Sequence, residues 1–269
     1  MEAVIPDLTY IIDLMNRHSG IKFSKEKSYV ILTKIYPLLK KYALKDVEEL
    51  TDAVKKNVDT KLVSELVDVL TINETSFYRD RYPFEALDKY ILPKMLEHDP
   101  TKKIVKILCA ACSTGQEPYS LVMHFLEQKQ YKLIPKITAI DLSSIVLDKA
   151  RAGVFNQFEV QRGLPITMLV KYFTQHEKDW LIREDIKNHV VFKKFNLKDN
   201  LSILGSFDLI FCRNVLIYFD EALRKQVIDN LVKAMNPKSS LILGATESIG
   251  WGEHPELSKV KDYSGIYSL

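Results

Sequence analysis

The sequence predicts an α/β fold in which a Rossmann-like sheet follows an all-α block. Three observations lead to this prediction. Residues 1–70 carry apolar residues at helical spacing, the chain beyond residue 101 alternates short apolar runs with helical stretches, and Ile104–Cys109 runs into a turn of small residues and then a helix. A strand, a small-residue turn and a helix can form a nucleotide pocket at the carboxyl end of the strand. The usual G-x-G-x-x-G pattern is missing here, with Gly115 its one glycine, so a plain βα turn is the alternative.

Composition limits the class of protein. The 269 residues are 46% hydrophobic, which is enough for one large or two smaller domains, and a net charge of +3 is too small for whole-protein attraction to nucleic acid. No apolar run approaches the ~20 residues of a membrane span, and Met1–Gly20 lacks the pattern of a signal peptide. Three cysteines are typical of a reducing compartment. We therefore expect a soluble, cytoplasmic protein with no membrane insertion and no nucleic-acid partner.

Cys109 and Cys112 form a C-x-x-C pair, which raises a redox or zinc site as an alternative. Thiol oxidoreductases place such a pair at a helix start, whereas Cys109 falls within the predicted strand. No second ligand pair for zinc accompanies it, and the six histidines are scattered. The sequence therefore favours a site without metal.

The first block should contain four helices. Their expected positions are a helix through Leu8, Ile11, Ile12 and Met15, then Lys25–Ala43 capped by Ser24, Asp46–Val54 and Thr60–Leu70. The second helix and its approach are basic, with Glu26 opposed by Lys22, Lys25, Lys27, Lys34, Lys40 and Lys41. These lysines form either a solvated face or a docking surface for an acidic partner.

The segment Thr71–Asp80, TINETSFYRD, crowds polar groups between apolar neighbours. A capped helix start explains Asn73 or Thr75 but does not require Arg79 nearby. We therefore interpret residues 73–100 as a linker folded over a pocket. Its helix, through Phe84, Leu87, Tyr90 and Ile91, should end at Pro93.

The α/β pattern then continues. A helix is expected at Glu117–Glu127 and a strand at Lys136–Ile140, ending at Asp141. Asp141 lies 26 residues after Gly115, near the ~20-residue interval at which such folds place a ribose-binding carboxylate. Alternatively, Asp141 could cap the helix that begins near Ser143.

An inserted β element interrupts this rhythm at Phe155–Arg183, with strand-like pieces at Phe158–Val160 and Trp180–Ile182. The remaining elements are a strand at Val190–Phe195 ending at Asn196-Leu197, a buried strand at Phe207–Cys212 followed by Arg213-Asn214, a helix at Glu221–Met235, and a terminal strand pair of Ser240–Gly244 with Asp262–Tyr267.

Four stretches together resemble the chemotaxis receptor methyltransferase (CheR) family. They are TINETSFYRD at 71–80, LCAACSTGQEPYSL at 108–121, AIDLSSIVLDKARAGVF at 139–155 and FDLIFCRNVLIYFD at 207–220, and LILGATES at 241–248 supports the match. The resemblance implies an all-α domain at 1–72, a linker at 73–100 and a class I methyltransferase domain at 101–269, with a small β-subdomain at about 155–190.

The resemblance also implies the reaction. A methyl group would pass from S-adenosylmethionine to glutamate side chains of bacterial chemoreceptors, giving glutamate methyl ester and S-adenosylhomocysteine. The implied cofactor-binding residues are Asn73, Thr75, Arg79, Ala111, Glu117, Asp141, Asn196, Leu197, Arg213 and Asn214. Arg79 and Tyr218 would be catalytic, the first holding a carboxylate and the second orienting its oxygen. The partner would be the helical bundle of the receptor, contacted through the basic helix 25–41, and a receptor C-terminal tail peptide could bind at the β-subdomain.

Three other functions remain as alternatives. A base-amino methyltransferase would carry an Asn/Asp-Pro-Pro-Tyr/Phe segment where this chain has Arg213-Asn214-Val215-Leu216. A non-catalytic S-adenosylmethionine-binding signalling module would keep the fold without turnover. A dehydrogenase would need the glycines that the turn after Cys109 lacks.

Overall fold

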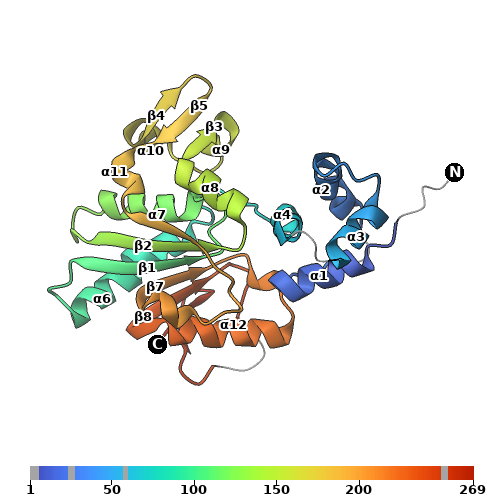
Figure 1. The fold of residues 1–269 in the computed structure, drawn as a ribbon. Helices are drawn as coiled ribbons and strands as arrows, with labels where there is room; N and C mark the ends of the chain where they lie inside the picture. The colour runs from blue at the N-terminus through green and yellow to red at the C-terminus, as the bar shows by residue number, and fades with distance from the viewer. Residues whose placement is uncertain (1–5, 24–27, 57–59, 250–253) are drawn as a thin grey trace. The chain divides into compact units, whose positions relative to one another are not determined.

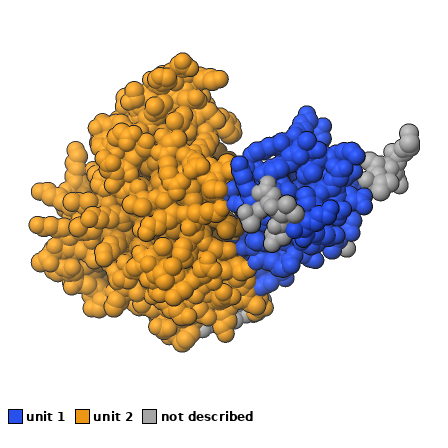
Figure 2. Space-filling view, viewed as in Figure 1, with its two compact units in different colours: residues 1–72, 218–220 blue, residues 73–217, 221–269 orange. Residues whose placement is uncertain are grey.

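The computed structural model describes residues 6–23, 28–56, 60–249 and 254–269. The chain divides into two compact units (Figure 2). One unit comprises Met1–Ile72 with Tyr218–Asp220, and the other comprises Asn73–Ile217 with Glu221–Leu269. The predicted cap Ser24 and the basic residues Lys25 and Lys27 lie outside the described residues.

The first unit is built from α-helices, which confirms the all-α prediction. Its helices are α1 Thr9–Ser19, α2 Ser28–Lys41, α3 Val47–Lys55 and α4 Thr60–Leu70. Asp46 caps α3 by accepting a hydrogen bond from the Glu49 amide at 2.9 Å. The residues at helical spacing are those that form the core, and the fully buried ones include Ile11, Met15, Ile31, Ile35, Leu50, Leu66 and Leu70.

The second unit contains a seven-stranded sheet in the order β6-β2-β1-β7-β8-β10-β9. Figure 1 labels β2, β1, β7 and β8 of this sheet. The strands are β1 Ile104–Ala110, β2 Ile134–Asp141, β6 Val190–Lys194, β7 Phe207–Cys212, β8 Met235–Leu243, β9 Ser258–Lys259 and β10 Ile266–Ser268. The first five strands pair in parallel, and β10 is antiparallel to both of its neighbours. Every residue of β7 is buried, as its mainly apolar sequence predicts for a central parallel strand.

Helices accompany this sheet along the chain. They are α5 Tyr82–Ala86, the π-helix η2 Leu87–Ile91, α6 Leu92–His98, α7 Gln116–Glu127, α8 Ser144–Ala152, α11 Glu184–Lys187, the 3₁₀ turns η3 Leu201–Leu204 and η4 Leu216–Tyr218, and α12 Glu221–Lys233. The strand order reverses between β1 and β7, because the chain goes from β1 to β2 on one side and returns to β7 on the other. In open α/β sheets ligands bind at the carboxyl ends of the strands at such a switch point.

A three-stranded antiparallel sheet, β3-β5-β4, is formed by the segment of the chain between β2 and β6 (Figure 1). Its strands are β3 Val154–Asn156, β4 Phe173–His176 and β5 Asp179–Ile182, and its helices are α9 Gln157–Gln161 and α10 Ile166–Tyr172. The predicted β insertion is therefore present, and the strand expected at Trp180–Ile182 belongs to β5.

The strand expected at Phe158–Val160 was wrong, because these residues belong to the helix α9. Asn156 and Glu159 form a capping box, in which each side chain accepts the amide of the other residue at 2.9 Å. This reciprocal cap satisfies two amides at the helix start, and it outweighs the strand propensity of three residues.

Two expected helix ends also differ from the structure. The helix does not end at Pro93, because the amide of Leu92 bonds to Leu87 five residues earlier, and the wide π-turn lets Pro93 enter the first turn of α6. Met235 begins β8 instead of ending a helix. Pro237 is tolerated there because β7 and β8 lose register between the pairs Phe207–Met235 and Leu209–Ser240.

Candidate functional site

The turn after β1 is built on left-handed backbone. Ala111, Ser113 and Gly115 have φ of 60°, 50° and 93°. The amide of Cys112 bonds to the Ile140 carbonyl of β2 at 2.9 Å, which holds the turn against the neighbouring strand. A left-handed non-glycine residue costs about 1–3 kcal/mol and persists where its surroundings hold it, commonly at a site that needs exposed backbone. The turn therefore presents main-chain groups at the switch point, and Ala111 is one of the predicted cofactor residues.

Asp141 joins the ends of β1 and β2. One carboxylate oxygen accepts the Ser113 amide at 2.9 Å, and the other accepts the Ser143 amide at 2.9 Å. Ser143 is the N-cap residue of α8, so Asp141 bonds the amide of the residue that precedes this helix. Ribose binding by Asp141 stays a prediction.

Residues 73–80, here called the strap, contact the turn after β1, the helix α7 and the smaller sheet. The carbonyl of Asn73 accepts the Ser113 hydroxyl at 2.8 Å, and the Tyr78 amide donates to the Ser120 hydroxyl at 3.0 Å. Phe77 is fully buried and meets two aromatic rings of the smaller sheet, Phe155 and Phe173, at 5.0 and 5.6 Å between centroids. The strap therefore passes the switch point in a defined position, and it carries the predicted residues Asn73, Thr75 and Arg79.

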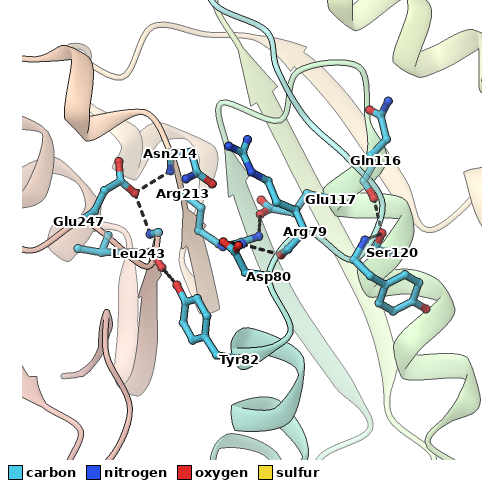
Figure 3. A network of polar contacts seen from close by, with 12 residues as sticks. Arg79, Asp80, Tyr82, Gln116, Glu117, Ser120, Arg213, Asn214, Leu243 and Glu247 are labelled. Carbon is cyan, nitrogen blue, oxygen red and sulfur yellow. Dashed lines mark hydrogen bonds and ion pairs between the residues drawn. The ribbon is translucent and has the colours of Figure 1, made fainter. Parts of the chain in front are cut away.

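Arg213 fastens the strap from the other side. Its guanidinium donates to Glu117 at 2.7 Å, to Asp80 at 2.8 Å and to the Arg79 carbonyl at 2.7 Å (Figure 3). The side chain is 2% exposed, and its Nε has no hydrogen-bond partner among the described residues. Burial raises the pKa of Glu117, and the guanidinium opposes that shift. Arg213 and Glu117, both predicted cofactor residues, therefore bind each other, and Arg213 also binds the strap.

The remaining predicted residues lie at other strand ends. The amide of Phe195 bonds to the Asp141 carbonyl at 2.9 Å, which brings the segment after β6, with Asn196 and Leu197, next to Asp141. Asn196 accepts the Lys198 amide at 3.1 Å, and Leu197 is buried. Asn214 follows β7 with a left-handed φ of 58°.

The two predicted catalytic residues belong to different units. Arg79 lies in the strap, where its guanidinium donates to the Glu74 carbonyl at 2.7 Å. Tyr218 ends η4 and is grouped with the helical unit, where its carbonyl accepts the Lys22 amide at 3.1 Å. Their joint action stays a prediction.

Glu247 was missed by the sequence analysis. It is 6% exposed and accepts backbone amides from the loop after β7. The sequence signal was a single glutamate in LILGATES, a stretch that served only as support for the family resemblance.

The described residues contain no group of three or more His, Cys, Asp or Glu that could hold a metal ion. Cys109 and Cys112 are free and buried, and burial raises the pKa of both thiols, which is typical of unreactive cysteines. Within the described part of the chain, no helix is long and apolar enough to cross a membrane.

Comparison with known proteins identifies the family. Residues 6–71 match the model described as CheR methyltransferase, all-alpha domain, and residues 73–265 match the model described as CheR methyltransferase, SAM binding domain. The chain is 38% identical to Chemotaxis protein methyltransferase 1 of Vibrio cholerae serotype O1, over 86% of this chain and 84% of that relative. It is 32% identical to Chemotaxis protein methyltransferase Cher2 of Pseudomonas putida, over 90% of each chain.

One solved structure in the comparison is that of the glycopeptide N-methyltransferase MtfA complexed with S-adenosyl-L-homocysteine. It covers 69% of this chain and 60% of its own at 16% identity, with a TM-score of 0.35, a likeness too low to add to the family assignment. The family models and curated relatives define an S-adenosylmethionine-dependent methyltransferase. The chain belongs to the CheR methyltransferase family, as the motif resemblance predicted.

Proposed function

We propose that this protein methylates glutamate side chains of bacterial chemoreceptors, giving glutamate methyl ester and S-adenosylhomocysteine. The observation that carries the proposal is the convergence of the strap, the turn after β1 and the loop after β7 at the switch point, in a chain of the CheR family. Residues 73–100 would act as the linker that covers the cofactor pocket.

The residues at the switch point fit S-adenosylmethionine. A Cβ added at Gly115 would stand 3.0 Å from the Cβ of Ala150 and 3.2 Å from the Tyr119 ring, so the turn must stay close to the helices beside it. The buried Arg213 Nε is a donor without a partner among the described residues, and the Asp141 carboxylate lies at the next strand end. These groups would hold the amino-acid and ribose portions of the cofactor, together with Asn73, Thr75, Ala111, Asn196 and Asn214.

The chemistry asks little of the protein beyond placement. S-adenosylmethionine supplies a methyl group already activated by its sulfonium. A glutamate carboxylate with a reference pKa of about 4.3 is already an anion at neutral pH, so no strong base is required. Arg79 would hold the carboxylate, Tyr218 would orient its attacking oxygen, and the strap would exclude water.

Two of the lysines of α2 bind other residues of the first unit, so fewer of them are available for a partner than the lysine count suggested. Lys34 donates to the Thr71 carbonyl at 2.6 Å, and burial lowers its pKa. Lys41 pairs with Glu65 at 2.6 Å. Lys40 instead lies over the ring of Tyr36. Tyr36 is exposed, and so is Tyr29, which lies about two helical turns before it. Tyr29, Tyr36 and Lys40 are called the α2 outer face.

We propose that the α2 outer face contacts the acidic helical bundle of the receptor. A lysine stacked on an exposed tyrosine keeps its charge and adds apolar contact area. Opposite potentials would then raise the encounter rate and set the register of the complex.

The smaller sheet has edge strands to which a receptor tail peptide would bind. In the order β3-β5-β4 the outer strands β3 and β4 each have one unpaired edge within the described sheet. An extended peptide can add a strand to such an edge through main-chain hydrogen bonds.

The test is incubation with radiolabelled S-adenosylmethionine and receptor-enriched membranes. We expect label on the receptor that mild base releases, because a glutamate methyl ester is base-labile. Label that resists mild base would show that the methyl group is held by a linkage other than a glutamate ester. Cofactor binding without any label on receptor would support the non-catalytic module, which the curated methyltransferase relatives do not favour.

A further inference from the structure

A buried carboxylate beyond the residues assigned above organises the loop after β7. One oxygen of Glu247 accepts the amides of Asn214 at 2.7 Å and Gly244 at 2.8 Å. The other accepts the amides of Val215 at 2.9 Å and Ile217 at 3.3 Å. Four amides from two separate loops therefore converge on one side chain that is 6% exposed. Figure 3 shows Glu247 with Asn214 beside it.

The chemistry of these partners matches an ionised carboxylate. All four partners are donors, and an ionised carboxylate is acceptor-only with about four acceptor positions. Successive backbone amides in a turn form a concavity that binds an anion, and here the anion is supplied by the chain itself. Asn214 keeps a left-handed φ of 58° within this arrangement.

Gly244 lies close to the Glu247 carboxylate and to the backbone of Asn214. A Cβ added at Gly244 would stand 2.5 Å from Glu247 Oε2 and 3.0 Å from the Asn214 amide nitrogen. The close approach of the carboxylate therefore depends on a glycine at position 244.

We propose that Glu247 is a positioning residue for the methyl-transfer site, because it sets the backbone of the loop that begins with Arg213 and Asn214. Arg213 in turn holds Glu117, Asp80 and the Arg79 carbonyl, so a shift of this loop would move the strap. The inference rests on the proposed function, since it assumes that these residues surround the cofactor.

The same strand provides a matched control at its opposite end. Asp208, near the amino end of β7, is 8% exposed and accepts from Lys102 at 3.0 Å, the Lys106 amide at 2.8 Å and Asn236 at 2.9 Å. It is a buried carboxylate whose three partners named above are not predicted site residues, so Asp208→Asn measures the cost of losing such a group for folding alone.

The experiment compares Glu247→Gln, Gly244→Ala and Asp208→Asn. For each full-length variant, calorimetry measures S-adenosylhomocysteine affinity, methylation assays give kcat and the KM for receptor, and thermal unfolding gives Tm. We expect Glu247→Gln and Gly244→Ala to weaken S-adenosylhomocysteine binding by about tenfold or more and to lower kcat, with an unchanged KM for receptor. Asp208→Asn should lower Tm and leave binding and kcat at wild-type values.

Gly244→Ala keeps the carboxylate but displaces it, so it decides the matter if Glu247→Gln fails to fold. Wild-type affinity and kcat in Glu247→Gln and Gly244→Ala, with only a lower Tm, would make Glu247 a structural residue and overturn the inference. A wild-type protein that does not bind S-adenosylhomocysteine would instead overturn the proposed function, and the inference with it.

Discussion

Asp141 is the residue whose predicted role can be tested most directly. Asp141→Ala removes acceptors for Ser113 and Ser143 and, in the proposed function, for the ribose. Loss of a charge-assisted hydrogen bond should weaken S-adenosylhomocysteine binding by roughly 1.5–3 kcal/mol in calorimetry. Asp148→Ala, at an exposed position on α8, is the control and should bind as the wild type does. Unchanged affinity in a folded Asp141→Ala protein would place the pocket elsewhere.

Tyr218 tests the chemical step. Tyr218→Phe removes one hydroxyl and little contact area, so kcat should fall about tenfold while cofactor affinity stays near the wild-type value. Tyr10→Phe removes the same hydroxyl from a ring of the helical unit, where Arg17 and Lys55 lie over it, and should leave kcat unchanged. Wild-type turnover in Tyr218→Phe would make Tyr218 a packing residue.

At the residue scale, the sequence identified candidates but not their partners. The residue types and the order of motifs pointed to Arg213 and Glu117. That these two bind each other, and that Arg213 also holds Asp80, depends on how three distant segments meet. Glu247 escaped for the same reason, because its four amide partners lie at positions that no local pattern connects to it.

At the scale of elements, the strap offers a contrast between apolar and charged fastenings. Phe77→Ala removes a fully buried ring between Phe155 and Phe173 and should lower the free energy of unfolding by about 3–5 kcal/mol. Arg162→Gln removes the exposed ion pair with Glu74 and should cost no more than about 1 kcal/mol. Denaturant unfolding of both variants measures the difference. Equal losses would show that the strap is not fastened mainly through Phe77.

Elements with a clear apolar pattern were predicted from the sequence. Others were determined by local backbone hydrogen bonds that an apolar pattern does not reveal. The strand expected at Phe207–Cys212 is β7 itself, a run in which Asp208 is the one charged residue and every residue is buried. Phe158–Val160 became helical through the cap of Asn156 and Glu159, and Pro93 was accommodated by a π-turn. Both outcomes depend on backbone hydrogen bonds that the apolar pattern does not report.

At the scale of the whole molecule, the class of each unit followed from periodicity, while the strand order required the family resemblance or the structure. The surface charge shows the same limit. Counting lysines suggested a broad basic face, but Lys34 and Lys41 are engaged by Thr71 and Glu65. A sequence-based charge reversal at these two positions would disturb folding contacts as well as docking.

The final prediction therefore concerns Lys40. Lys40→Glu reverses the charge of the α2 outer face, so the KM for receptor should rise while S-adenosylhomocysteine affinity stays constant. Lys55→Glu is the control, because Lys55 also lies over a tyrosine ring but on α3. Exposed charges are screened over about 8–10 Å at physiological ionic strength, so added salt should raise the wild-type KM and shrink the difference between wild type and Lys40→Glu. A KM for Lys40→Glu that matches Lys55→Glu at low salt would show that α2 is a solvated face and that the receptor docks on another surface.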